Sequence, residues 1–125
     1  MDLNDKTDDE ILLIANPVMD NLMDGATERD WAKHTLHFTD GAKASLTEAE
    51  LLRQCEQYQS THGVFKERVF MGITRHPDYT NIVWKQTMTK ASGEYMAFLT
   101  LVQKESEYLV TVSYTHLTLP TTPYV

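Results

Sequence analysis

Histidine is the residue type in this chain with the clearest spacing for chemistry. His34 and His37 are three residues apart, so a helix would bring both imidazoles to one face, where they could bind a metal ion. Zinc sites need three or four ligands, and no carboxylate or further histidine stands at a supporting spacing. The five glycines do not cluster into a phosphate-binding loop. We therefore expect no metal and no cofactor.

Cys55 is the single cysteine, which excludes a disulfide within the chain. A thiol becomes a good nucleophile when a neighbouring base or positive charge lowers its pKa. Cys55 falls on the apolar side of an expected helix, and free cysteine is among the most buried residue types. We expect a small core residue here and not a reactive thiol.

Glu67 is the acidic residue best placed to act as an acid or base. Alternation along an expected strand puts it on one face with Phe65 and Val69, and a carboxyl group in apolar surroundings has a raised pKa. The alternatives are a strand bulge that turns Glu67 outward, or an ion pair with Lys85 on the neighbouring strand. We favour these alternatives, because charged groups are rarely buried without a partner.

Large apolar and aromatic side chains could line a ligand pocket between helices and a sheet, although such residues more often belong to the core. The pocket residues that we predict are Trp31, Tyr58, Phe65, Glu67, Trp84, Met88 and Phe98. The core residues that we predict are Leu22, Leu51, Cys55, Val69, Trp84 and Phe98.

Three capping motifs predict the helices that must position these side chains. Thr7, Thr27 and Thr47 each stand three residues before an acid, so that hydroxyl and acid can satisfy free N–H groups of a first turn. Apolar residues three and four apart then predict helices over about residues 8–24, 28–37 and 48–61.

Proline and glycine punctuate the first of these helices. Pro17 lacks the N–H that would bond to Leu13, which predicts a kink or, alternatively, a fresh helix start capped by Asn16. Gly25 is suited to the position that follows a helix end. The segment TDGAKAS, residues 39–45, is typical of a loop.

After Gly63 the apolar pattern changes to a period of two, which indicates strands. Turn sequences RHPDY, KASGE and KESE divide this half into four strands joined by hairpins. The third strand, YMAFLTLVQ, is apolar on both faces, as expected of a strand covered on both sides. The fold class is therefore α+β, with three N-terminal helices packed on one face of a four-stranded antiparallel sheet.

The order of these segments resembles a known family. ATERDWAKHTLHFTD, LTEAELLRQCEQYQSTHGVFKERVFMGI, YTNIVWKQTM and GEYMAFLTLV are similar to small uncharacterised domains of the nuclear-transport-factor-2-like superfamily, over roughly residues 8–111. The resemblance implies a cystatin-like fold whose curved sheet forms a cone with a pocket. Members include isomerases, dehydratases and hydrolases, and also ligand-binding and dimerising modules. The enzymes carry an acid/base pair, such as Asp with His or Tyr, that has no matching pair in this chain.

We accordingly expect a non-enzymatic module that binds a small apolar ligand or dimerises. The alternative is a small isomerase- or dehydratase-type enzyme with Glu67 or Tyr58 inside the cone. A homodimer is expected through the open face of the sheet, because the third strand has a second apolar face of Met96, Phe98 and Val102.

Charge and hydropathy exclude several partners. The net charge is −7, which argues against nucleic acid and anionic membrane, because phosphate binding needs a basic face. The acidic N-terminal segment MDLNDKTDDE has no signal-peptide pattern, and no apolar run approaches the ~20 residues that span a bilayer. A single cytoplasmic domain over residues 1–111 is the expectation.

The C-terminal segment VSYTHLTLPTTPYV, residues 112–125, contains no Asp, Glu, Lys or Arg. Its first ten residues resemble the translation of a transposon-end sequencing adapter with its primer segment, so we expect a non-native tail without functional residues, His116 included. High β propensity at Val112, Tyr114 and Thr115 predicts that the last strand continues to about Thr115. Pro120 and Pro123 should end any pairing.

Overall fold

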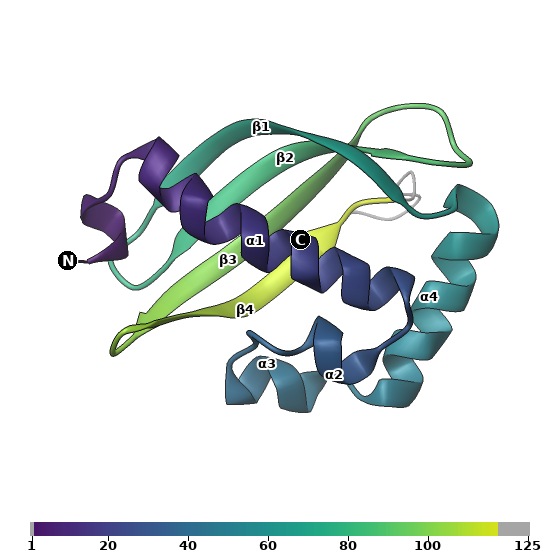
Figure 1. The fold of residues 1–125 in the computed structure, drawn as a ribbon, viewed down its shortest axis with the longest axis horizontal. Helices are drawn as coiled ribbons and strands as arrows, with labels where there is room; N and C mark the ends of the chain where they lie inside the picture. Colours follow the sequence, from purple (N-terminus) through teal and green to yellow (C-terminus); the bar gives the residue numbers. More distant parts are fainter. Residues whose placement is uncertain (1, 118–125) are drawn as a thin grey trace.

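The computed structural model describes residues 2–117. Its helices are a 3₁₀ turn η1 (Leu3–Asp5), α1 (Asp8–Thr27), α2 (Trp31–His34), α3 (Asp40–Ser45) and α4 (Glu48–His62). The strands are β1 (Phe65–Arg75), β2 (Thr80–Met88), β3 (Tyr95–Lys104) and β4 (Glu107–Thr115) (Figure 1). The sheet order is β1-β2-β3-β4 with every neighbouring pair antiparallel, so the predicted α+β class and meander are confirmed.

Two of the three predicted helix starts are confirmed. Thr7 and Glu10 form a complete capping box, in which the Glu10 N–H donates to the Thr7 hydroxyl and the Thr7 N–H donates to the Glu10 carboxylate. Thr47 accepts from the N–H of Glu50 at the start of α4. The start at Thr27 is wrong, since Thr27 is the last residue of α1 and Asp30 caps the next helix.

The helices between α1 and α4 differ from the prediction in number and place. The expected helix over 28–37 is only the four residues of α2, because Phe38 leaves the helix to pair with Val110. The expected loop over 39–45 contains α3, whose first turn is capped by the Thr39 hydroxyl accepting from the N–H of Ala42. The described residues therefore hold four α-helices and not three.

The first helix is longer than predicted and unbroken. α1 runs through Pro17 as one helix, so the alternative of a fresh start at Asn16 is wrong. It also continues past Gly25 to Thr27, so Gly25 does not mark its end. The absence of a side chain at Gly25 allows α1 and α2 to approach each other closely.

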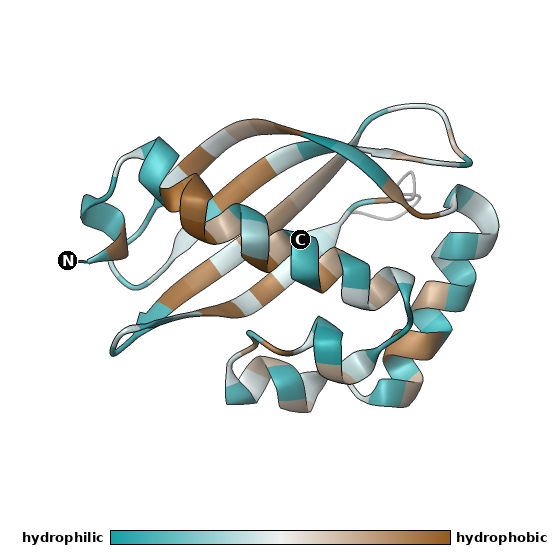
Figure 2. Ribbon diagram, viewed as in Figure 1, coloured by the Kyte–Doolittle hydropathy of each residue, from teal (hydrophilic) through white to brown (hydrophobic). Residues whose placement is uncertain are grey.

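One face of the sheet packs against α1, which crosses it in Figure 1. Bands of apolar residues cross the strands beneath this helix (Figure 2). The core of this layer is made by Leu3, Ile11, Ala15, Met19, Leu22, Met23, Ile82, Trp84, Ala97, Leu99, Leu101 and Val110. Of the predicted core residues, Leu22, Leu51, Cys55 and Trp84 are confirmed as buried.

The other two predicted core residues lie on the opposite face of the sheet. Val69 is 57% exposed, and Phe98 is half-buried beside Tyr114. The cause on β1 is a pair of register shifts, between Phe65 and Arg68 and between Phe70 and Gly72. Each bulge places an extra residue in β1, so simple alternation assigns the wrong face to the residues between them.

Arg68 is the polar residue that the bulge turns toward α1. Its guanidinium lies 4.9 Å from the centre of the Trp84 ring and donates to the Asp20 carboxylate at 2.7 Å and to Asn16 at 3.3 Å. These contacts fasten the middle of α1 to β1 and β2.

The free edge of β4 is covered by the segment that follows α2. The N–H of Val110 donates to the His37 carbonyl at 2.7 Å, and the N–H of Thr39 donates to the Val110 carbonyl at 2.9 Å. This short parallel bridge ties α2 and α3 to the sheet. The bridged residues Phe38 and Val110 also form one side of a cavity between the helices and β4.

The predicted end of the last strand near Thr115 is confirmed. The expectation for Pro120 and Pro123 lies outside the described residues. Across residues 2–117, none of the helices is both apolar and long enough to cross a bilayer.

Candidate functional site

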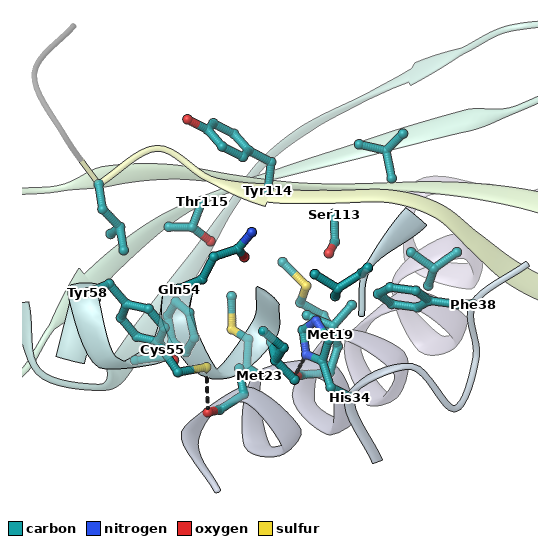
Figure 3. A pocket seen from close by; sticks show the side chains of 18 of the residues that line it. Met19, Met23, His34, Phe38, Gln54, Cys55, Tyr58, Ser113, Tyr114 and Thr115 are labelled. Carbon is teal, nitrogen blue, oxygen red and sulfur yellow. Dashed lines mark hydrogen bonds between the residues drawn. The ribbon is translucent and has the colours of Figure 1, made fainter. Parts of the chain in front are cut away.

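A cavity of about 790 Å³ lies between the second half of α1, the α2–α3 region, α4 and the last part of β4 (Figure 3). Its apolar wall includes Met19, Leu22, Met23, Phe38, Leu51 and Phe65. This size is within the range of about 300–1,000 Å³ that small-molecule pockets occupy.

The cavity exists because α4 packs against the end of α1 and meets the sheet only near Phe65, at the start of β1. Leu51 and Cys55 of α4 form a small buried cluster with Ala26 of α1. The Cys55 thiol donates to the Ala26 carbonyl at 3.3 Å and is fully buried, as predicted. The side chains of α4 and β4 that face each other do not fill the space between these two elements, and a cavity remains.

Charge is missing from this cavity. The chain has 11 Lys and Arg and 18 Asp and Glu, yet none of the described residues that line the cavity is one of these four types. A charged group transferred into apolar surroundings needs a partner of opposite charge, and the lining supplies none. The walls therefore suit an uncharged molecule.

His34 is the most buried polar group of the lining, at 8% exposure. Its Nδ1 lies 2.7 Å from the carbonyl oxygen of Leu22, and its ring meets Phe38 edge to face at 5.3 Å. Burial lowers the pKa of His34, with the bond to Leu22 acting in the opposite direction. The imidazole is therefore held in its neutral form near neutral pH.

Gly25 allows α2 to approach α1 closely enough for His34 to line the cavity. A Cβ built on Gly25 would lie 2.5 Å from the backbone nitrogen of His34 and 2.6 Å from its Cα, closer than real Cβ contacts come. The absence of a side chain lets α2 lie directly on α1. A further bond from the Asn21 amide to the Lys33 carbonyl at 2.9 Å holds the same contact.

Tyr58 and Cys55 form the other end of the cavity. The Tyr58 ring lies 5.4 Å from that of Phe65. Burial is the main cause that raises the pKa of Tyr58 to about 12, so its hydroxyl keeps its proton at neutral pH. Burial also raises the pKa of Cys55. Neither group is activated as a nucleophile.

Most of the wall on β4, from Val112 to Thr115, belongs to the segment that resembles an adapter translation, and Val110 and Thr111 precede it. Ser113 and Thr115 point into the cavity, and Tyr114 points away from it (Figure 3). Positions 113 and 115 are thus the places where a different native sequence would change this wall.

The structure brings two of the seven predicted pocket residues, Tyr58 and Phe65, to the cavity. Trp84 and Met88 are buried on the inner face of β2, and Phe98 lies on the outer face of the sheet.

Trp31 packs outside the cavity against the α4 cluster, with its indole N–H donating to the Leu46 carbonyl at 2.7 Å. Glu67 is exposed, on the bulged part of β1. The outward bulge was one of the two alternatives for Glu67, and it is confirmed. The other is wrong, because Lys85 pairs with Glu94 at 3.4 Å.

His34 was missed as a cavity residue because its spacing from His37 directed attention to metal binding. α2 ends at His34, and the His37 carbonyl bonds to β4, so the two residues do not share a helix face. Within residues 2–117 no three His, Cys, Asp or Glu side chains group closely enough to hold a metal ion. A glycine inside an amphipathic helix was the one sequence feature that could have indicated the close contact.

A second hollow, of about 400 Å³, lies near η1 and the β1–β2 turn. Its polar groups bond largely to one another. The Thr80 hydroxyl donates to the Asn4 side chain at 2.5 Å, the Asn4 amide donates to the His76 carbonyl, and the Leu3 N–H donates to Gln103 at 2.9 Å. These bonds fasten the N-terminal turn to the sheet.

No family model and no curated protein matches this chain. Among solved structures, it is similar to Bd1075 of Bdellovibrio bacteriovorus, with a TM-score of 0.52, 10% sequence identity and 90% of this chain covered. The chain covers 42% of the Bdellovibrio chain, which is less than half of its length. At this identity the likeness shows the α+β fold alone.

Proposed function

We propose that this chain is a ligand-binding module of the nuclear-transport-factor-2-like type, without catalysis, which holds a small, uncharged and largely apolar molecule. The observation that carries the proposal is the cavity of about 790 Å³, whose described lining contains no Asp, Glu, Lys or Arg. Because no described lining residue is charged, an anion or a cation bound in this cavity would have no counterion.

Support for the family comes from the order of the elements. Helices followed by a four-stranded antiparallel meander agree with what the sequence resemblance implies. The cone-shaped, cystatin-like curvature is part of the same proposal. The position of Glu67 supports a function without catalysis, because this carboxylate is exposed and the cavity lining holds no other.

Titration with prodan, an uncharged dye whose emission depends on polarity, tests the proposal. We expect saturable binding with a blue shift of the emission. Ser113→Trp places a large ring in the cavity and should weaken binding at least about tenfold, a loss of about 1.4 kcal/mol. Leu13→Trp is the control, because Leu13 is 78% exposed on α1 and does not line the cavity. Equal binding by both variants, or none by the parent chain, would refute the proposal.

A homodimer through the outer face of the sheet is a second proposed property. Val69, Met71 and Met96 are 57%, 54% and 52% exposed, and Val69 and Met96 flank the same residue of β2, Lys85. Exposed apolar residues gathered on one face are typical of association surfaces. Dimerisation on this face leaves the cavity on the inner face free.

A further inference from the structure

We infer that His34 selects the ligand by accepting a hydrogen bond at Nε2 from a hydroxyl or N–H group of an uncharged, otherwise apolar molecule. The inference rests on the proposed function and deepens it, since it assigns the polar end of the ligand and its hydrogen-bonding role.

The first step is the tautomer of His34. The carbonyl oxygen of Leu22 can only accept a hydrogen bond, so Nδ1, 2.7 Å away, must carry the proton. In a neutral imidazole the other nitrogen, Nε2, then has a lone pair and no proton. Within residues 2–117 no group bonds to this atom.

The second step is the position of Nε2. His34 lines the cavity with one ring nitrogen on the Leu22 carbonyl and the other toward the open space (Figure 3). The ring is held between the bond to Leu22 and the edge-to-face contact with Phe38. A fixed acceptor that faces the cavity is the kind of group that orients a ligand, because a ligand that displaces water from Nε2 without replacing its hydrogen bond loses affinity.

The third step is the contrast with the other polar groups of the lining. Hydroxyl and amide side chains such as Ser45, Gln54, Tyr58 and Ser113 can both donate and accept. Nε2 of His34 can only accept. A ligand with a donor satisfies it, whereas an ether in the same place or a carboxylate does not.

Three naphthalene derivatives of similar size provide the test. 2-Naphthol has a donor, 2-methoxynaphthalene has only an ether oxygen, and 2-naphthoate has a negative charge. We expect the dissociation constant of 2-naphthol to be about threefold to tenfold lower than that of 2-methoxynaphthalene, as one neutral hydrogen bond provides. 2-Naphthoate should bind more weakly than either.

Two substitutions separate the ligand bond from the structural bond of His34. In His34→Asn the amide nitrogen can replace Nδ1 on the Leu22 carbonyl, while nothing reaches the place of Nε2, so the preference for 2-naphthol should be lost. In His34→Gln the side chain reaches the place of Nε2 with an amide oxygen, and part of the preference should return. His76→Asn is the control, because this histidine stacks on Tyr79 outside the cavity, and it should keep the preference of the parent chain.

The outcomes distinguish the two proposals. If 2-naphthol and 2-methoxynaphthalene bind the parent chain equally, or His34→Asn keeps the parent's preference while remaining folded by circular dichroism, the role of His34 is overturned and the cavity still binds ligands. If none of the three compounds binds the parent chain, the proposed function itself fails.

Discussion

At the scale of single residues, the buried imidazole of His34 ties the cavity to the stability of the fold. Burial lowers its pKa in the folded chain, and no charged side chain contributes to the shift. The unfolded chain protonates this histidine near its ordinary pKa of about 6.5 and the folded chain only at lower pH. The unfolded state therefore binds more protons below about pH 6.5, and the free energy of unfolding should fall as pH decreases through that value.

Urea unfolding at pH 7.5 and pH 5.5 measures this effect. The parent chain should lose more stability between the two values than His34→Asn, which keeps the bond to Leu22 without a titrating group. Equal losses in the two proteins would show that His34 is protonated as easily in the folded chain as in the unfolded one.

Gly25 is the residue whose side chain must be absent for His34 to stay in place. Gly25→Ala should destabilise the fold by about 1–3 kcal/mol, because the new methyl group meets the His34 backbone, which cannot rotate away. Gly41→Ala in α3 is the matched control, since nothing lies within 4 Å of its Cβ position. That change should be neutral or stabilising by up to about 1 kcal/mol. Thermal melts that rank the two variants in the other order would contradict the close packing of α1 and α2.

At the scale of elements, substitutions in β1 and β2 test which residues of these strands belong to the core. Trp84 is 1% exposed between α1 and Arg68, and Trp84→Ala should cost about 3–5 kcal/mol. In the monomeric chain, Val69→Ala on the outer face should change stability by no more than about 0.5 kcal/mol. Chemical unfolding of both variants checks the pair. A melt of Trp84→Ala that matched the parent would refute the placement, and a large loss for Val69→Ala would refute the bulged register of β1.

The sequence predicts those elements whose causes are local. The capping box of Thr7 and Glu10, the cap at Thr47 and the turns between strands depend on neighbouring residues, and they occur where they were expected. The course of the chain between α1 and α4 depends on a distant partner, the Val110 backbone, which draws Phe38 out of the helix. Local pattern carries no information on such a contact.

The candidate site was predictable only in part for the same reason. Tyr58 and Phe65 follow from aromatic residues on either side of Gly63. The bulges of β1 place Val69 and Glu67 outside the core, and a period-two pattern contains no sign of an inserted residue. His34 needs both the close approach at Gly25 and the carbonyl of Leu22, which come together only in the folded chain.

At the scale of the whole molecule, the exposed apolar face of the sheet predicts self-association. Light scattering should give twice the monomer mass of 14.4 kDa at micromolar concentrations. Met96→Lys should return the chain to a monomer, because it places a charge in the centre of the face. Leu13→Lys is the control, since Leu13 is 78% exposed but lies on α1. A parent chain that remains monomeric across a wide concentration range would exclude the dimer.

The methionines report most directly on the central claim, the binding of an uncharged ligand in the cavity. Met19 and Met23 line the cavity, Met88 is buried outside it, and Met71 and Met96 lie on the outer face. The direct measurement is a titration of methyl-labelled methionine NMR signals with 2-methoxynaphthalene. Met19 and Met23 should shift and saturate together while Met71 and Met96 stay unchanged. Shifts confined to Met71 and Met96, or no saturable shift at any methionine, would contradict a ligand site between α1, α4 and β4.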